Sequence, residues 1–534
     1  MSSQNFSMKS YMQGALLLTI AALIVKVLSA AYRVPFQNLV GDQGFYVYQQ
    51  VYPFVAIFVT WTAGGVAVAI SKMLADIESE TIHGRARRKF ILKVIYQYLT
   101  VLSLLFFSIL FFGAPVLASW MEDEGLVTPL RVGAFITLCM PILAILKGSF
   151  QSRGVMNPIA YSQVFEQAIR VSVILLGTMI VMATTKSVYG AGTIAILGTV
   201  IGEIAGILLL FYFIRKQNLL ESVPKVKTPK WPIIKEITLF SLSVSMSSLL
   251  LISFQLIDSF TIFPLLVQSG IEYETAQIMK GIYDRGQPLV QLGLVIASSL
   301  SLAIVPLVAF KASKDTGRGA IPFINLTFRA TIVFAVAASF GLVFVMPYVN
   351  KALFKADILS DVLSIYSMQI IPLSIIITMT AILQGYGKLF VPALFIVLSC
   401  ILKWIGNILF IPSHELLGVA LTSNISLFVC AFGILIYVYK VLKTPLAPVS
   451  FYVKLIVATA LMGVSIFIVA AILENLLLDM SRTTAIIYCV VCITVGAATF
   501  ISVVAKLRVL KEKEWFLIPL GRRMAAYQLW LNKR

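Results

Sequence analysis

Charged side chains are scarce in this sequence. Only 12% of its 534 residues are Asp, Glu, Lys or Arg, against roughly 25% in soluble globular domains. Hydrophobic residues make up 59% of the chain, and the mean hydropathy is +0.95. This composition excludes a soluble globular domain and predicts an integral membrane protein.

The residue types that carry most enzyme chemistry are also scarce. The two histidines, His83 and His414, fall in loops far apart in the sequence, and no acidic or Cys/His cluster has metal-ligand spacing. All five cysteines fall inside apolar runs, where an unpaired Cys behaves as a small hydrophobe. No GxxxxGK[ST] phosphate loop occurs, so ATP is not expected to be the direct energy source. We therefore expect no enzyme, no cofactor and no metal site.

Apolar runs long enough to cross a hydrocarbon core of about 30 Å fill nearly the whole chain. Fourteen spans fit, at 12–35, 45–71, 92–118, 128–148, 158–182, 190–213, 236–264, 286–310, 322–346, 360–383, 389–411, 415–439, 452–474 and 484–505. Most Lys and Arg fall in loops on the side of the N-terminus, and the positive-inside rule makes that side cytoplasmic. Because the number of spans is even, both termini are expected in the cytoplasm. The net charge of +19 then reflects topology and attraction to anionic lipid better than nucleic-acid binding.

A weak internal repeat divides the chain. FQSRG at 150–154 has a counterpart in LQGYG at 383–387, which is 233 residues later. Sixteen residues after the last glycine of each motif, a cation lies inside the next span, Arg170 in the first copy and Lys403 in the second. The offset covers six spans, so both copies have the same orientation, as in one class of secondary transporters.

The repeat predicts an all-α membrane protein with two six-helix lobes in a parallel pseudo-twofold repeat and two extra C-terminal helices. The expected parts are an N-lobe at 1–214, a cytoplasmic linker at 215–235, a C-lobe at 236–440, the last two spans at 441–506 and a basic amphipathic tail at 507–534. We expect the tail to lie on the inner leaflet, and a frayed cytoplasmic end is the alternative.

Charges inside the spans are costly, so each should face a partner, water or a substrate. Glu166 and Arg170 form an i, i+4 pair, and Glu203 in the next span should lie at a similar depth, which favours a structural ion pair. In the C-lobe, a stripe with Gln255 and Asp258 and another with Lys403 and Asn407 leave two interpretations open. Asp258 and Lys403 could form a structural ion pair between two helices of the C-lobe, or these residues could couple transport to an ion.

Three cations at the heads of spans 1 and 8, the two spans expected to flank the opening between the lobes, have few acids near them in the sequence. These are Lys26, Arg33 and Arg285, with Asp42 and Asp284 the only nearby acids. They predict a site for an anionic ligand. The alternative for Arg33 and Arg285 is that their long side chains simply reach the outer interface.

Four stretches give the chain a family resemblance. KVLSAAYRVPF at 26–36, YQQVYPFVAIFVTWTAGGVAVAISKMLAD at 48–76, FQSRGVMNPIAYSQVFEQ at 150–167 and KWIGNILFIPSHELLGVALTSNIS at 403–426 resemble the polysaccharide-transporter branch of the multidrug/oligosaccharidyl-lipid/polysaccharide (MOP) flippase superfamily. Within it the chain is most similar to the stage V sporulation protein B group and the lipid II flippases. The resemblance covers nearly the whole chain.

The resemblance implies a flippase of the bacterial cytoplasmic membrane that moves an undecaprenyl-diphosphate-linked saccharide, such as lipid II or a polysaccharide repeat unit, to the outer leaflet by alternating access. By position it implies substrate contacts for Arg33, Asp42 and Arg285, and a groove for the lipid tail at spans 13 and 14. Lys403 replaces a ligand of the sodium site in some lipid II flippases, which disfavours sodium coupling.

Two other functions stay open at this point. One is a multidrug or cation-coupled extruder of the same superfamily, and the other is a membrane scaffold or enzyme of wall synthesis. The expected partners are the lipid-linked saccharide, membrane lipids and enzymes of wall or polysaccharide synthesis, and the protein is expected to be a monomer.

Overall fold

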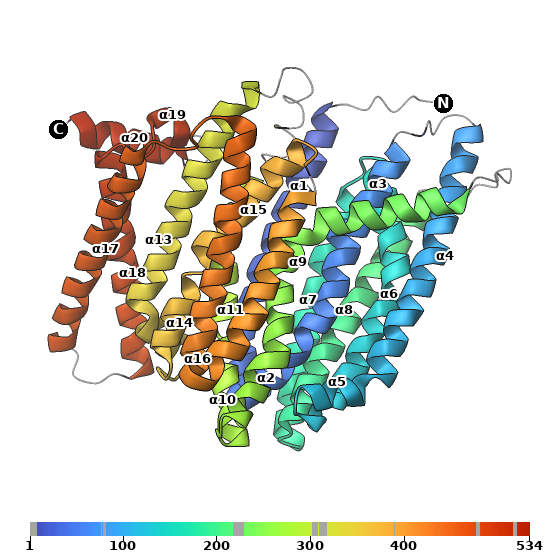
Figure 1. Ribbon diagram of the computed structural model, residues 1–534, viewed down its shortest axis with the longest axis horizontal. Coiled ribbons are helices and arrows are strands. Elements are labelled where there is room, and N and C mark those ends of the chain that lie inside the picture. The colour runs from blue at the N-terminus through green and yellow to red at the C-terminus, as the bar shows by residue number, and fades with distance from the viewer. Residues whose placement is uncertain are drawn as a thin grey trace. The chain divides into compact units, whose positions relative to one another are not determined.

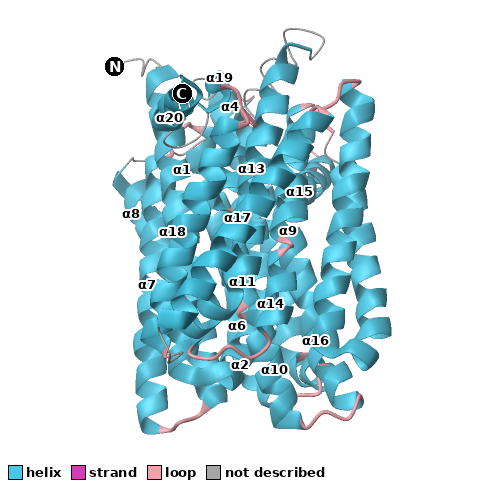
Figure 2. Ribbon diagram, turned by 90° about the vertical axis from the view of Figure 1, so that its left-hand side faces the viewer, coloured by secondary structure: helices cyan, strands magenta, loops and turns pink. Residues whose placement is uncertain are grey.

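The computed structural model describes residues 8–75, 77, 82–216, 229–301, 308, 318–388, 390–476, 481–515 and 521–533. Within these residues the regular secondary structure is entirely helical and no strand is present (Figure 2), which confirms the predicted all-α fold. Most of the predicted linker at 215–235 and the end of the predicted span at 286–310 lie outside the described residues.

Packing divides the chain into two compact units, Met1–Asp284 and Arg285–Arg534. The helices of the first unit are α1 (Met8–Ala31), α2 (Arg33–Thr60), α3 (Ala67–Ala75), α4 (Ile82–Phe112), α5 (Ala114–Trp120), α6 (Val127–Ser152), α7 (Asn157–Thr184), α8 (Val188–Lys216), α9 (Lys230–Gln268) and α10 (Tyr273–Asp284) (Figure 1). A π-helix, Trp61–Val66, joins α2 to α3, and a 3₁₀ turn, Glu124–Leu126, precedes α6.

The helices of the second unit are α11 (Gly286–Gly293), α13 (Ile321–Phe354), α14 (Ser360–Ser367), α15 (Ile370–Gly385), α16 (Phe390–Leu442), α17 (Val449–Leu476), α18 (Arg482–Lys506), α19 (Glu512–Trp515) and α20 (Gly521–Lys533). A 3₁₀ turn, Arg318–Ala320, precedes α13. These units follow from packing, whereas the predicted lobes follow from the repeat, so the lobe boundaries remain predictions.

Eleven helical segments of the described chain are long and apolar enough to cross a membrane. Two of them, Ile20–Ala75 with 56 residues and Phe390–Leu442 with 53, are far too long for one crossing, since about 20 residues suffice. Each contains one residue with non-helical backbone angles, Gly41 in α2 and Glu415 in α16. The predicted breaks between spans 1 and 2 and between spans 11 and 12 fall at these two positions. The total of fourteen spans stays a prediction.

The chain reverses direction at Gly41. Its φ of 71° and ψ of −175° belong to a region that is essentially open only to glycine. Side chains before and after the reversal meet: the Tyr32 and Tyr48 hydroxyls are hydrogen-bonded, and the rings of Phe36 and Tyr48 lie 5.3 Å apart edge to face. Residues 33–40 and 42–60 are therefore the two antiparallel legs of one hairpin, called here the α2 hairpin.

The second reversal, at Glu415, builds a similar hairpin in α16. Glu415 has a φ of 47° and a ψ of −132°, although it is not a glycine. Across the reversal, the Lys403 ammonium donates a 2.6 Å hydrogen bond to the Ser423 hydroxyl. Gly406 lies so close to Thr422 that an added Cβ would stand 2.2 Å from the Thr422 methyl group. Lys403 is therefore held against the returning leg of its own helix pair.

The two copies of the repeat motif have the same backbone geometry. Gly154 and Gly387 have φ values of 69° and 73°. In each copy the first residue of the motif accepts a hydrogen bond from the amide five residues later: Val155 to Phe150 at 3.1 Å, and Lys388 to Leu383 at 2.8 Å. The turn that ends α6 is thus repeated at the end of α15, as the spacing of 233 residues predicts.

Candidate functional site

Arg33 lies in an aromatic frame built by the α2 hairpin. It is the first residue of α2 and is fully buried. Its guanidinium lies over the ring of Tyr52, 4.8 Å from the ring centroid. Tyr52 in turn packs against Tyr48, with their ring centroids 5.5 Å apart. The reversal at Gly41 makes this possible, because it brings a cation of the first leg beside aromatic rings of the second.

A second buried cation lies on α10. Lys280 donates hydrogen bonds of 2.7 Å to both carboxylate oxygens of Asp284, and both side chains are buried. Burial raises the pKa of the Asp284 carboxyl, and the negative charge of Asp258 on α9 acts in the same direction, whereas Lys280 and Arg33 oppose it. Arg33, Asp258 and Lys280 therefore all act electrostatically on the Asp284 carboxyl. These four residues are called here the α10 charge cluster.

Sequence reasoning missed Lys280. The predicted spans leave residues 265–285 as a loop, whereas Tyr273–Asp284 form the amphipathic helix α10. The i, i+4 spacing of Lys280 and Asp284 was the available signal, because it is the spacing of paired charges on a helix. Asp284 itself was noted only as one of the few acids near Arg285.

The α10 helix packs directly on the turn of the α2 hairpin. An added Cβ on Gly281 would stand 2.1 Å from the backbone oxygen of Asp42, so only glycine permits this approach. The Gln37 amide donates to the Asp42 carboxylate across the turn at 2.9 Å, and the Gln43 amide donates to the Gln277 side chain at 2.7 Å. Asp42, a predicted substrate contact, is thus placed where α2 and α10 meet.

A buried carboxylate, Asp123, ties this region to α8. It accepts hydrogen bonds from the Tyr46 hydroxyl at 3.0 Å, the Tyr189 hydroxyl at 2.9 Å and the Gln277 amide at 3.2 Å. Burial and the charge of Asp123 raise the pKa of Tyr273 to about 12. This network joins α2, α8 and α10.

Lys26 and Arg33 differ in their surroundings, although their spacing places them on one helix face. Lys26 on α1 is exposed, together with its neighbours Leu23, Ile24 and Val27. Arg33, two turns later, is fully buried. The expected cationic path from Lys26 to Arg33 therefore begins at an accessible side chain and ends at an enclosed one.

Arg285 belongs to the second compact unit, where it precedes α11. It is 1% exposed, and it donates a 2.8 Å hydrogen bond to the side-chain oxygen of Asn350 on α13. Its guanidinium also lies over the ring of Phe354, 5.2 Å from the centroid. Asn350 is itself fixed by donating to the Ile358 carbonyl at 3.0 Å. Arg285 is thus an oriented, buried cation, like Arg33 in the first unit.

The ion pair predicted in the N-lobe is part of a cluster of four charged side chains. One Arg170 nitrogen lies 2.9 Å from Glu166 and 3.5 Å from Glu203, and Lys147 on α6 lies 3.7 Å from the other oxygen of Glu166. All four side chains are at most 11% exposed. Gly202 keeps α8 close to α7 here, since an added Cβ would stand 2.9 Å from the Arg170 Cβ. Lys147 was missed because it lies at the end of a predicted span.

The residues considered for ion coupling fall in different compact units. Asp258 is 6% exposed on α9, and Gln255 on the same helix is half-buried. Lys403 and Asn407 are fully buried on α16. A pairing of Asp258 with Lys403 remains a prediction. Among the described residues, no group of three or more His, Cys, Asp or Glu side chains is arranged to hold a metal ion.

Comparison with known proteins identifies the family. A family model described as polysaccharide biosynthesis protein matches residues 11–310. The uncharacterised membrane protein YabM of Bacillus subtilis is 32% identical over 519 residues, which cover 96% of each chain. Stage V sporulation protein B of Bacillus subtilis is 34% identical over 207 residues, covering 38% of this chain and 39% of that one.

Similarity to lipid II flippases is found in both sequence and fold. The lipid II flippase MurJ of Bacillus subtilis is 23% identical over 550 residues, covering 97% of this chain and 98% of that one. A solved structure of MurJ in an inward closed conformation superposes with a TM-score of 0.64 at 15% identity, covering 91% of this chain and 98% of that one. The relatives with a stated transport activity are flippases rather than enzymes, in agreement with the prediction of a non-enzyme.

These matches confirm the family resemblance and the multi-pass membrane fold. The chain belongs to the polysaccharide biosynthesis protein family of the MOP superfamily, related to stage V sporulation protein B and to MurJ.

Proposed function

We propose that this protein is a flippase for a lipid-linked saccharide, and that its substrate is an undecaprenyl-diphosphate-linked sugar of the cell envelope. The observation that supports this most is the placement of Arg33, fully buried over Tyr52 and within electrostatic reach of the Lys280–Asp284 pair. Arg33 and Lys280 are the buried cations that an anionic head group would contact there. An arginine suits a diphosphate because its planar guanidinium can bind two oxygens at once.

Transport is proposed to run from the cytoplasmic to the outer leaflet of the bacterial cytoplasmic membrane, with both termini in the cytoplasm. Arg33 and Arg285 hold the diphosphate, while Lys26 and Asp42 line the path of the head group. The two lobes then rock about the bound head group, as in transporters built from parallel repeats.

The lipid tail stays in the bilayer during this movement, along α17 and α18. Both helices expose large apolar side chains, among them Ile456 at 68% and Phe467 at 75% on α17, and Val490 at 60% on α18. Such a surface is typical of helices that face the hydrocarbon of a membrane, where an isoprenoid chain could lie along it.

Coupling is proposed to use the membrane potential or protons rather than sodium. The ammonium of Lys403 is fully buried and donates to Ser423 at 2.6 Å. An ammonium group has no lone pair for a cation, so this position cannot supply a sodium ligand. Asp258, Gln255 and Asn407 are the remaining candidates for sensing an ion or a voltage.

Genetic complementation tests the proposal. Cells depleted of their lipid II flippase are given the wild-type protein, the Arg33→Ala variant or the Arg131→Ala variant. Arg131 is the matched control because its guanidinium also lies over an aromatic ring, Phe111 at 5.7 Å, but the side chain is exposed. We expect rescue by the wild type and by Arg131→Ala, and none by Arg33→Ala at equal protein level.

Absence of rescue by the wild type, together with no binding of undecaprenyl-diphosphate sugars to the purified protein, would overturn the proposal. Rescue by Arg33→Ala as complete as that by the wild type would retain a flippase but remove Arg33 from its site.

A further inference from the structure

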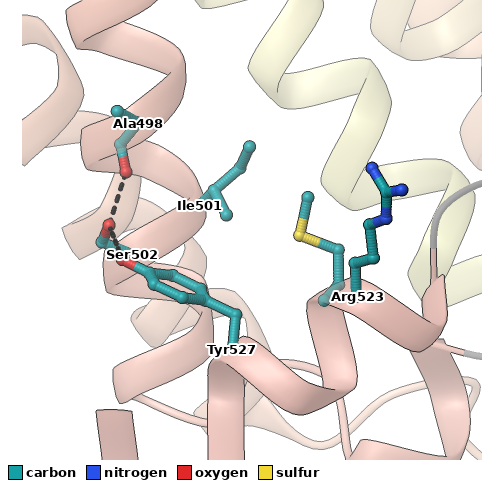
Figure 3. Close-up of a pocket in the computed structure, with 6 residues that line it drawn as sticks. Ala498, Ile501, Ser502, Arg523 and Tyr527 are labelled. Atoms are coloured by element: carbon teal, nitrogen blue, oxygen red, sulfur yellow. Dashed lines mark hydrogen bonds between the residues drawn. The ribbon is translucent and has the colours of Figure 1, made fainter. Parts of the chain in front are cut away.

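A groove of about 310 Å³ lies between the C-terminal end of α18 and the tail helix α20 (Figure 3). It is called here the tail groove, and its lining residues are Ala498, Ile501, Ser502, Arg523, Met524 and Tyr527. The first three are on α18 at i, i+3 and i+4, and the last three are on the first two turns of α20. All of them belong to the second compact unit, whereas the α10 charge cluster belongs to the first.

The groove is held open by a fixed contact between the two helices. The hydroxyls of Ser502 and Tyr527 are hydrogen-bonded at 2.8 Å, and the Ser502 hydroxyl donates to the Ala498 carbonyl at 2.6 Å, as Figure 3 shows. Further along, Lys506 donates to the Leu531 carbonyl at 3.0 Å, and Asn532 donates to the Ala505 carbonyl at 3.1 Å. The polar atoms of this contact are thus hydrogen-bonded to each other. The remaining side chains that line the groove are apolar except for Arg523.

The position of the groove along α18 places it where the acyl chains and head groups of a bilayer meet. Ala498 precedes the end of α18 at Lys506 by eight residues, which is about 12 Å along the helix axis. The 25 residues of α18 span about 38 Å, so its ends exceed a hydrocarbon core of about 30 Å by only a few ångströms. Ala498 therefore lies at the level of acyl chains, and the end of α18 lies at the level of head groups.

The positive charge of α20 favours an anionic ligand. The helix carries Arg522, Arg523 and Lys533 and has no acidic residue. Within the described residues, the guanidinium of Arg523 has neither an ion pair nor a hydrogen bond, and the residue is exposed at the groove. The exposed face of α20 also carries Trp530, at 53% exposure. Tryptophan and arginine together on one exposed face are typical of a helix at the membrane interface.

We propose that the tail groove binds an anionic glycerophospholipid of the membrane. One acyl chain lies along Ala498, Ile501 and Met524, and the head-group phosphate lies at Arg523. A free phosphate would leave the apolar floor of the groove uncovered, and a zwitterionic lipid would bring its own cation toward Arg523. The site shares α18 with the surface proposed for the lipid tail of the substrate, but none of its residues belongs to the α10 charge cluster, where the head group is proposed to bind.

Native mass spectrometry of the full-length protein in detergent tests this inference. The protein is titrated with phosphatidylglycerol or with phosphatidylcholine of the same acyl chains. The variants are Arg523→Ala, Arg523→Lys, Ala498→Phe to fill the groove, and Arg522→Ala as the matched control. Arg522 is the neighbouring exposed arginine and does not line the groove.

We expect phosphatidylglycerol to bind more tightly than phosphatidylcholine. Arg523→Ala should lower phosphatidylglycerol binding about fivefold, as expected for one cation at an anionic surface. Arg523→Lys should keep most of the binding because it keeps the charge, and Arg522→Ala should leave it unchanged. Ala498→Phe should weaken both lipids, since it removes the space for the acyl chain.

Several results would overturn the inference. Equal binding of the two lipids would mean that no anion is recognised, and an equal loss in Arg522→Ala and Arg523→Ala would mean diffuse attraction to the whole helix. Competition by soluble glycerol phosphate at the same concentration would point to a free anion. Displacement of phosphatidylglycerol by far less undecaprenyl phosphate would assign the groove to the transport substrate.

Discussion

Replacement of Arg170 by methionine is expected to destabilise the first compact unit severely. The wild-type cluster of Lys147, Glu166, Arg170 and Glu203 has two positive and two negative charges, all nearly buried. Arg170 lies 2.9 Å and 3.5 Å from the two carboxylates, and each such contact is worth about 5 kcal/mol of Coulomb energy at an effective dielectric constant of about 20. Arg170→Met removes both contacts and leaves a net negative charge away from water.

Breaking a buried ion pair from one side typically costs about 3–5 kcal/mol, because the remaining charge is left uncompensated. We expect a loss of this size in the free energy of unfolding, measured by titration with a denaturing detergent. The double variant Arg170→Met/Glu203→Gln should recover at least half of the loss, since it returns the cluster to neutrality. The exposed Arg131→Met is the control, with an expected change within about 0.5 kcal/mol.

Two results would refute this reasoning. If Arg170→Met is as stable as the wild type, the cluster does not brace α7 against α8. If the double variant is less stable than Arg170→Met, the stabilisation comes from individual hydrogen bonds and not from charge balance. A stable Arg170→Met protein that no longer transports would instead move the cluster from the scaffold to the transport mechanism.

Two further substitutions test the site and the fold. Lys280→Ala should abolish rescue of flippase-depleted cells, because it leaves the buried Asp284 carboxylate without its paired lysine. Lys351→Ala, which breaks a more exposed ion pair with Asp357, is the control and should rescue normally. Full rescue by Lys280→Ala would exclude a role for this lysine. Gly41→Ala should lower the free energy of unfolding by about 1–3 kcal/mol, because the backbone angles of Gly41 lie in a region essentially open only to glycine. Gly341→Ala, in open space on α13, should be neutral or slightly stabilising. Equal stability of the two variants would contradict the strained turn.

Much of the architecture could be predicted because bilayers impose a simple rule on sequence. Apolar runs of helical length marked the spans, and the repeat of FQSRG in LQGYG marked two equivalent turns, which the structure builds with the same hydrogen bonds. The reversal at Gly41 falls between predicted spans 1 and 2, and the reversal at Glu415 falls on the first residue of predicted span 12.

The candidate site was only partly predictable, because burial and pairing depend on contacts between distant segments. Arg33 was found from its type and place in a span, but its aromatic frame exists only through the α2 hairpin. Lys280 was missed because an amphipathic helix outside the apolar runs was interpreted as a loop. Asp123 was missed for a similar reason: its partners come from α2, α8 and α10, which no local pattern connects.

An equilibrium titration measures whether Arg33 binds a diphosphate lipid. Purified wild type and Arg33→Ala are titrated with a fluorescent undecaprenyl-diphosphate sugar, with Arg131→Ala as control. Loss of a charge-assisted contact costs about 1.5–3 kcal/mol, so the Kd should rise about 10- to 150-fold in Arg33→Ala and stay unchanged in Arg131→Ala. A Kd for Arg33→Ala equal to that of the wild type would contradict the account.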